Sequence, residues 1–523
     1  MISNSEFSKN ERWVLLGLLI LMLFALLVNL GIYPLYLEEP RRGLIALEMI
    51  LRDNYLVTTQ TGDLYFRKPP FYNWLLILSY QLFGSYSELA TRIVSVVSLL
   101  ITGGVIYRFF KSRIGERLAI YSALSYIACV DILFYFSMIG EIDLFYSLVT
   151  FLVFVVIIHF GEKEKYWPLF LLVYGLTAVG FLTKGLTSLS YLAISLLVYF
   201  IYERKFKVLF SIQHIVSILL FFGCLAVYFY GYSLSEDASG WYTTLLSESA
   251  DKAVGGGFSD SLIHFFTFPL ITLANLLPVS FFIPVLFFKS VRDQLKSDRF
   301  MVLVVLLFAA NFLVYWFSAE AKSRYIYPLF PLLITIILVG SSIISSNWVK
   351  KYTKILTYTL LSIATVALPI MLFIRQLEIV DNLLVIVILL EILVATLWWL
   401  YTQRNVQAYM IIIGAFLVLR LAYSFTVPVT RQMTTGAAED KALGLEIAEI
   451  TQGESLHRFG DVRMSLTIVF YLEGARQDII SQKEVFESGY YFVYDEDLPD
   501  ADLIVKEFHY HDKPIYLIRV NGD

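Results

Sequence analysis

The chain has few of the residues that stabilise small secreted domains or bind nucleic acid. Only two of its 523 residues are cysteines and only 16% carry a charge, with a net charge of −4. Cys129 and Cys224 both lie inside apolar runs, so we predict neither a disulfide framework nor a zinc site. A basic tail, a heptad repeat and a low-complexity segment are also missing, which argues against nucleic acid as a partner.

Apolar sequence, by contrast, is abundant. Hydrophobic residues make up 58% of the chain and the mean hydropathy is +0.70, values that exclude a soluble globular protein. Apolar runs of about 17–25 residues, each ended by charges, are typical of helices that cross a membrane. The first run is followed by no small-residue cleavage site, so we expect a retained helix rather than a signal peptide.

The runs predict an all-α polytopic membrane protein with about thirteen spans. The predicted spans are 13–33, 88–110, 118–136, 144–160, 167–183, 186–202, 209–232, 264–288, 300–317, 325–345, 354–374, 382–401 and 408–426.

The distribution of basic residues predicts the orientation of these spans. With the N-terminus in the cytoplasm, the inner loops between spans hold sixteen Lys and Arg residues, whereas the outer loops beyond the first hold five. We therefore expect a multi-pass protein of the cytoplasmic membrane, with its N-terminus inside. An odd number of spans places the chain after residue 426 outside the cytoplasm.

Two segments on the outer side are large, and they define two predicted domains. In residues 34–87, a loop within the transmembrane domain 1–426, apolar residues recur at helical spacing after Pro40, which predicts an amphipathic helix along the membrane surface. Residues 427–523 have intermittent apolar character and predict a small extracytoplasmic α/β domain. Its helix is expected at 441–450, and its strands at 490–494, 502–505 and 514–520. Acceptor docking and a lid over the site are both open roles for it.

Charged residues gather at the outer ends of the predicted spans, where a charge is costly unless it has a partner or a wet cavity. Five groups share this position: Glu38, Glu39, Arg41 and Arg42; Arg67 and Lys68; Glu141 and Asp143; Lys184; and Lys322 and Arg324. A single cavity lined by acids and cations would account for all of them. Each group also has a structural explanation, such as an i,i+4 pair or an interfacial anchor. Asp131, within a span, is expected to pair inside the bundle.

Such a cavity has the groups needed for transfer from a phosphate-linked donor. A carboxylate can take a proton from an attacking group, and Lys and Arg can neutralise the charge on a departing phosphate. Aromatic side chains, among them Tyr65, suit a sugar ring or a lipid chain. The six histidines have no metal-ligand spacing, and His509 and His511 are expected at the surface.

Several motifs in this order resemble those of the polytopic C-type glycosyltransferases that use polyprenyl-phosphate sugars. The likeness is to the aminoarabinose transferase and protein O-mannosyltransferase-like group. The motifs are Glu38-Glu39-Pro40-Arg41, Tyr65-Phe66-Arg67-Lys68-Pro69, the acid Asp143, Thr183-Lys184-Gly185 and the run from Arg324 to Pro331. Arg92 and the tail stretch MSLTIVFYLEGA are also similar to family positions.

The resemblance implies a donor, a reaction and roles for residues. The donor would be a polyprenyl-phosphate-linked sugar, transferred among membrane lipids to a lipid, glycan or protein acceptor, with inversion. The candidate catalytic acids are Glu38, Glu39 and Asp143, and the candidate donor-phosphate-binding residues are Arg41, Lys68, Lys184, Tyr65 and Arg324.

Two positions depart from the family pattern. Glu38 stands where the family has aspartate, and Arg67 stands where relatives have an acid that helps hold a structural metal. His264 is similar to another such ligand, but without the acid we predict no metal and no cofactor. An arginine at position 67 would favour a more anionic donor or acceptor.

Other functions remain possible from the sequence. A lipid flippase or transporter would need charges through the membrane midplane or an internal repeat, and neither is visible in the sequence. A polymerase or ligase that uses a diphosphate-linked oligosaccharide, and a structural subunit with a decayed site, are further alternatives.

Overall fold

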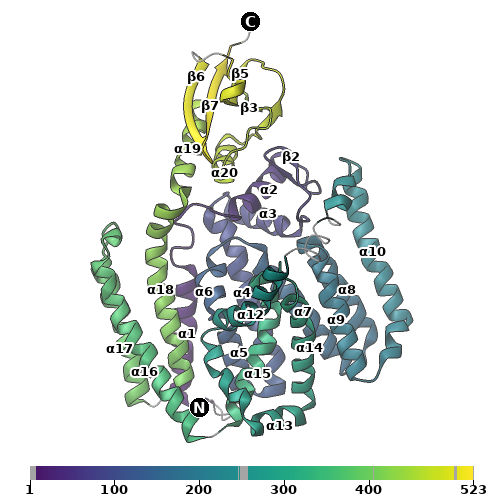
Figure 1. Ribbon diagram of the computed structural model, residues 1–523, viewed down its shortest axis with the longest axis vertical. Coiled ribbons are helices and arrows are strands. Elements are labelled where there is room, and N and C mark those ends of the chain that lie inside the picture. The colour runs from purple at the N-terminus through teal and green to yellow at the C-terminus, as the bar shows by residue number, and fades with distance from the viewer. Residues whose placement is uncertain are drawn as a thin grey trace.

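A bundle of long apolar helices forms most of the molecule, and a small domain of helices and strands sits at one end of it (Figure 1). This computed structural model describes residues 7–244, 247, 257–344, 346–404, 406–499 and 503–521. The two ends of the chain lie at opposite ends of the molecule (Figure 1). We call the end of the bundle that carries the C-terminal domain the domain end.

Ten helical segments within the described residues are long and apolar enough to cross a membrane. They are α1 (Lys9–Leu27), α4 (Glu88–Ile114), α7 (Ile142–Gly161), α8 (Tyr166–Lys184), α10 (Ile212–Ser233), α14 (Arg299–Trp316), the segment Ser323–Ile343 formed by η4 and α15, the segment Asn347–Phe373 formed by α16 and η5, α17 (Leu383–Gln403) and α18 (Ala408–Thr435). The pair α5 (Glu116–Ile127) and Val130–Met138, bent by 48°, raises the number to eleven.

The predicted fold class is confirmed, whereas the predicted number of spans is too high. The span predicted at 186–202 is the short helix α9 (Thr187–Tyr202). The span predicted at 264–288 is interrupted, because α12 (Phe258–Asn275) ends before Pro278 and the 3₁₀ segment η3 (Val279–Phe287) follows. Proline has no amide hydrogen to donate and clashes with the preceding turn. An apolar run therefore does not guarantee one continuous helix.

Shorter elements connect the long helices. They are η2 (Phe206–Phe210), α13 (Lys289–Ser297) and η6 (Arg375–Leu377), and at the domain end α2 (Glu39–Leu51), the hairpin β1 (Thr59–Gln60) and β2 (Asp63–Leu64), and α3 (Phe71–Phe83).

The C-terminal domain is a five-stranded mixed sheet with two helices. It consists of α19 (Ala437–Ile450), β3 (Leu456–Phe459), α20 (Leu466–Arg476), β4 (Ser481–Lys483), β5 (Gly489–Tyr494), η7 (Asp495–Asp497), β6 (Ile504–Tyr510) and β7 (Lys513–Val520). The strand order is β4-β3-β5-β7-β6; β3 is parallel to both β4 and β5, while β7 is antiparallel to both β5 and β6.

Most of the elements predicted for this domain are present. The predicted helix and three strands are α19, β5, β6 and β7, although Asp502, at the start of the second strand, lies outside the described residues. The elements β3, β4 and α20 come in addition. Helix α18 runs through residues 426 and 427, where we expected the domains to meet, and ends at Thr435.

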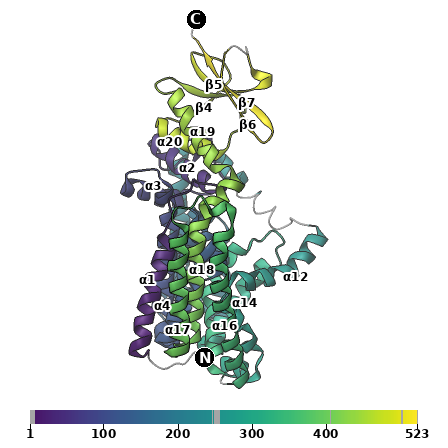
Figure 2. The same cartoon turned by 90° about the vertical axis from the view of Figure 1, so that its left-hand side faces the viewer.

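Helix α2 is the helix predicted to lie on the membrane surface, but protein covers both of its sides. It lies between α3 and α20 (Figures 1 and 2), and contacts both. Leu44 and Leu47 of α2 belong to the same apolar core as Ile468 and Leu472 of α20. Burying such side chains contributes about 1.5–3 kcal/mol each. The C-terminal domain is therefore fixed to the segment that carries the first charged motif.

Candidate functional site

Three charges from distant parts of the chain meet at the domain end of the bundle. Asp143 lies in the first turn of α7, Lys184 ends α8, and Arg324 lies in η4. Lys184 Nζ is 2.6 Å from Asp143 Oδ1, and Arg324 Nε is 3.8 Å from Asp143 Oδ2. The side chains of Asp143 and Lys184 are only 2% and 8% exposed, whereas that of Arg324 is 28% exposed.

Two aromatic rings lie beside the ammonium group of Lys184. Its Nζ lies 4.9 Å from the ring centroid of Tyr146 and 4.6 Å from that of Tyr325. A cation held over ring faces and against one carboxylate is stabilised in a place of low solvent access. These contacts fix the position of the ammonium.

A second cluster lies next to the first, around Glu141. Arg42 Nε is 3.8 Å from the Glu141 carboxylate, and Arg42 Nη1 is 3.5 Å from the Tyr65 hydroxyl oxygen, which accepts its hydrogen bond. Burial raises the pKa of Glu141 to about 7, while Arg42 opposes the shift and Asp143 adds to it. Because the charge of Asp143 raises the pKa of Glu141, the two clusters form one charged region.

Glu38 is the most accessible acid of the region. It precedes α2 and forms an ion pair with Arg41, and their side chains are 42% and 25% exposed. The charge of Glu38 also raises the pKa of Glu141. A carboxylate with this exposure is free to meet a substrate, because protein does not cover it.

Glu39, unlike Glu38, is buried and hydrogen-bonded to protein. Its two oxygens accept hydrogen bonds from Arg92 Nε at 2.8 Å and Nη2 at 3.0 Å. One of the oxygens also accepts from the amide of Gly140 at 2.7 Å. Arg92 in turn donates to the carbonyls of Leu30, Tyr33 and Pro34. This arrangement links the first charged motif, α4 and the start of α7.

Gly140 allows this approach of segments. A Cβ atom at Gly140 would lie 2.6 Å from Thr91 Cγ2 and 3.0 Å from the Thr91 carbonyl oxygen on α4. Only glycine fits against the helix backbone so closely. The close contact brings the start of α7, with Glu141 and Asp143, next to α4 and to Glu39 of α2.

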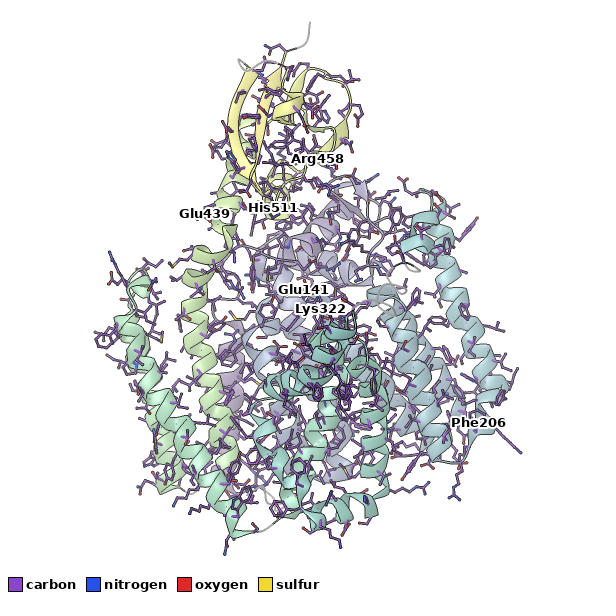
Figure 3. All side chains as sticks on the ribbon, viewed as in Figure 1. Glu141, Phe206, Lys322, Glu439, Arg458 and His511 are labelled. Atoms are coloured by element: carbon purple, nitrogen blue, oxygen red, sulfur yellow. The ribbon has the colours of Figure 1, made fainter. Side chains whose placement is uncertain are left out.

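The structure thus brings most of the sequence-predicted site residues to one end of the bundle. Figure 3 shows Glu141 and Lys322 close together in the half of the bundle nearer the C-terminal domain, whereas Phe206 lies in the other half. Lys322 is exposed, and Lys68 Nζ donates to the carbonyl of Arg67 at 3.0 Å. The catalytic and phosphate-binding roles assigned to all of these residues stay predictions.

Two other expectations concern polar residues inside and beside the bundle. The pairing predicted for Asp131 is confirmed, since the Tyr327 hydroxyl donates to its carboxylate. His264 Nε2 lies 3.1 Å from the Tyr315 carbonyl oxygen. Among the described residues, no three His, Cys, Asp or Glu side chains are placed to hold a metal ion.

The C-terminal domain supplies site-adjacent residues that the sequence did not reveal. Arg458 on β3 donates to the carbonyl of Thr61 at 2.7 Å and pairs with Asp63 at 3.0 Å. Tyr471 on α20 accepts a hydrogen bond from the amide of Leu35 at 3.0 Å. Nothing local in the sequence marks these side chains, because their partners lie almost 400 or more residues away.

Comparison with known proteins agrees with the fold. Residues 67–230 match the family model described as dolichyl-phosphate-mannose-protein mannosyltransferase. The crystal structure of ArnT from Cupriavidus metallidurans bound to undecaprenyl phosphate superposes with a TM-score of 0.71 at 17% sequence identity, and covers 98% of this chain and 99% of that one. The chain has the fold of this ArnT. The resemblance inferred from the motifs is confirmed.

Two further matches point the same way. The apo structure of the same ArnT gives a TM-score of 0.71 at 17% identity, over 99% of this chain and all of that chain. The undecaprenyl phosphate-alpha-4-amino-4-deoxy-L-arabinose arabinosyl transferase 1 of Proteus mirabilis (strain HI4320) is 29% identical over 214 residues. This match spans 39% of the chain and 37% of that relative's length.

Proposed function

We propose that this protein is an integral membrane glycosyltransferase that uses a polyprenyl-phosphate-linked sugar, such as an undecaprenyl-phosphate sugar. The observation that carries the proposal is the meeting of Glu38–Arg41, Arg42–Glu141 and Asp143–Lys184–Arg324 at one end of the bundle. The family match over residues 67–230 and the relatives named above support it.

The reaction is a displacement at the anomeric carbon of the donor sugar. A nucleophilic oxygen or nitrogen of the acceptor forms a bond to this carbon, the bond from the carbon to the phosphate oxygen breaks, and the electron pair leaves with the polyprenyl phosphate. The acceptor loses a proton to a base. Cations near the departing phosphate lower the barrier, because they stabilise charge that grows in the transition state.

We assign these tasks to different residues, and the geometry supports the assignment. Glu38, the accessible carboxylate, is the base that takes the proton or orders the acceptor. Lys184 and Arg324, with Arg41 and Lys68, bind the donor phosphate. Asp143 holds Lys184 at 2.6 Å and keeps its ammonium in place, so it positions the cation rather than acting as a second base.

The membrane location follows from the same proposal. The protein lies in the cytoplasmic membrane with its N-terminus in the cytoplasm, and the domain end faces the extracytoplasmic side. The N- and C-termini at opposite ends of the molecule support this topology (Figure 1). The acceptor is a lipid, glycan or protein on that side of the membrane.

The proposal is tested with the purified full chain in lipid nanodiscs and a panel of undecaprenyl-phosphate monosaccharides. Loss of the sugar from the lipid is measured for the wild type, Glu38→Gln and Arg324→Gln, with Lys111→Gln as a control at an exposed ion pair beside α5. Turnover of one donor that falls in the first two variants but not in the control supports the proposal and identifies the sugar. Equal turnover in all four proteins, or in none, argues against it.

A further inference from the structure

Two buried carboxyl groups meet where the C-terminal domain contacts the first loop. Glu48 lies on α2 and Glu473 on α20, two helices that contact each other (Figures 1 and 2). Neither residue is exposed to solvent. A Cβ atom at Gly474 would lie 3.8 Å from Leu47 Cδ2, so the chain neighbours of the two acids touch across the interface. The two acids therefore lie at the contact between the helices.

Each carboxyl accepts hydrogen bonds from backbone amides on its own side of the interface. The amides of Thr61 and Gly62, in the turn between β1 and β2, donate to the two oxygens of Glu48, the second at 3.2 Å. The amide of Ile480 donates to Glu473 Oε1 at 3.1 Å. These contacts adjoin, because a Cβ atom at Gly62 would lie 3.3 Å from the Ile480 carbonyl oxygen. The hairpin, α2 and the C-terminal domain thus share one buried polar cluster.

One carboxyl oxygen in this cluster lacks a partner. Glu473 Oε2 is buried and has no hydrogen-bond partner among the described residues. Burial raises the pKa of both acids, that of Glu48 to about 7, because a carboxylate removed from water is costly. When one carboxyl of such a pair is protonated, its O–H can donate to the other. A single proton would therefore remove one charge and complete the hydrogen bonding.

The charges that act on the pair come from three places around it. They are Arg52 at the end of α2, Arg458 on β3 and Asp478 after α20. Arg52 also lies 3.8 Å from Glu236, and Arg458 also pairs with Asp63 at 3.0 Å. Two arginines that are shared with other acids do not balance two further carboxylates, to which Asp478 adds negative charge.

The other helices that pack against α2 and α20 offer the pair no partner among the described residues. Helix α3 contains no charged residue, and the remaining charged residues of α2 are those paired at the candidate site. The charged residues of α19 and α20 are exposed or have partners elsewhere: Glu439 and Glu449 are exposed, Lys441 pairs with Glu88, Glu446 pairs with Lys506, Asp440 accepts from Ser465, and Arg476 donates to the carbonyls of Thr451 and Glu454.

We propose that Glu48 and Glu473 share one proton, and that this proton fastens the C-terminal domain to the first loop as a pH-sensitive contact. With the proton bound, the hairpin, α2 and α20 are held together. As the pH rises past the raised pKa of Glu48, about 7, two carboxylates face each other without water and the contact weakens. The domain then contacts the segment before Glu38 through fewer bonds, among them that of Tyr471 to Leu35. The inference does not depend on the proposed transferase activity.

Hydrogen exchange of the full chain in lipid nanodiscs, followed by mass spectrometry, tests the contact. Peptides that contain Thr61, Gly62 and Ile480 are the reporters, because these amides donate to the two carboxyls. Exchange is compared at pH 5.5 and pH 8, after correction for the intrinsic effect of pH on exchange. We expect the reporter amides of the wild type to exchange at least about tenfold faster at pH 8, as loss of a proton over this range predicts.

Glu473→Gln is the deciding variant. Its side chain keeps an oxygen for the Ile480 amide and has an NH₂ group in place of the protonated oxygen, so it imitates the protonated carboxyl at every pH. We expect this variant to fold and its exchange to change by less than about twofold between the two pH values. Glu446→Gln, at an exposed pair with Lys506 in the same domain, is the control and should behave like the wild type.

Infrared titration of the protonated carboxyl groups tests whether the proton is shared. The signal of the pair is the part of the wild-type absorption that changes in Glu48→Gln and in Glu473→Gln. We expect each variant to lower the pKa of the carboxyl that remains, because it removes a neighbouring negative charge.

Several results would overturn the proposal. They are equal corrected exchange of the wild type at both pH values, a pH difference in Glu473→Gln as large as in the wild type, failure of Glu473→Gln to fold, and two carboxyls that titrate independently. No sugar donor enters these experiments, so failure here is distinct from failure of the proposed transferase activity.

Discussion

The carboxylate of Asp143 lies 2.6 Å from the ammonium of Lys184, although 41 residues and two helices separate them in the chain. Both side chains are almost completely buried. A pair of this kind is costly to break, because either partner alone is left as an uncompensated buried charge. Its position at the first turn of one helix and the end of the next fixes the cation that we assign to the donor phosphate.

Breaking this pair is expected to destabilise the protein as well as inactivate it. Asp143→Asn leaves Lys184 unpaired and should lower the free energy of unfolding by about 3–5 kcal/mol. The double variant Asp143→Asn/Lys184→Met, which removes both charges, should be more stable than Asp143→Asn and remain inactive. Thermal unfolding and donor turnover measure the two effects. Additive losses of stability would show that the charges do not interact.

Glu38 and Glu39 are adjacent in the sequence but should respond differently to substitution. Glu38 is 42% exposed and paired only with Arg41 among the described residues, so Glu38→Gln should change stability by less than about 1 kcal/mol. Its turnover should fall at least about a hundredfold, the contribution expected of a general base.

Glu39→Gln, in contrast, disrupts the buried hydrogen bonds to Arg92 and should cost about 3–5 kcal/mol of stability. The unfolding midpoint and turnover of the two variants, measured side by side, check this contrast. A stable but inactive Glu39→Gln would instead assign direct chemistry to Glu39.

The stability of the domain end should depend on pH through Glu48. This residue of α2 accepts hydrogen bonds from the amides of Thr61 and Gly62, and burial raises its pKa from 4.5 to about 7 against the opposing effect of Arg52. Burial raises the pKa of Glu473 of α20, and the charge of nearby Glu48 raises it further.

The sign of the effect follows from the raised pKa. A carboxyl with a higher pKa in the folded state favours folding fully below about pH 4.5, and this contribution is lost as the pH rises to about 7. The wild type should therefore unfold at a lower temperature at pH 7.5 than at pH 5.5, and Glu48→Gln should reduce this difference. An unchanged difference in the variant would contradict the assignment.

Tyr471 should connect the C-terminal domain to the segment that precedes Glu38. Its hydroxyl accepts from the amide of Leu35 and donates to Glu88 at 2.7 Å. Tyr471→Phe leaves both groups without this partner and should cost about 1–3 kcal/mol of stability. We also expect lower turnover, because Leu35 precedes Glu38 by three residues. Tyr516→Phe is the control, since within the described residues the Tyr516 hydroxyl forms no hydrogen bond. Equal turnover in both variants would remove this role.

The sequence predicted the arrangement of charges better than it predicted individual contacts. Apolar runs fix which loops share a side of the membrane, so the pattern of these runs was enough to expect Asp143, Lys184 and Arg324 at one end of the bundle. The break at Pro278 was not anticipated, because mean hydropathy does not register where a helix stops.

The burial of α2 was missed for a different physical reason. An amphipathic pattern shows that one face needs an apolar partner, but lipid and a protein domain satisfy it equally well. Leu47 packs into the core of the C-terminal domain, more than 400 residues further along the chain. Long-range partners of this kind also explain why Arg458 and Tyr471 could not be recognised from sequence.

The most direct test of the account is whether the sugar–phosphate bond of the donor breaks at the domain end. Proteoliposomes are loaded with an undecaprenyl-phosphate sugar labelled in the sugar, and the label released from the lipid is counted for the wild type and Arg324→Gln. The account predicts release by the wild type and a loss of about tenfold or more in the variant, because a cation at the departing phosphate is removed. Labelled lipid that changes leaflet while the sugar stays attached would contradict the account and favour a flippase.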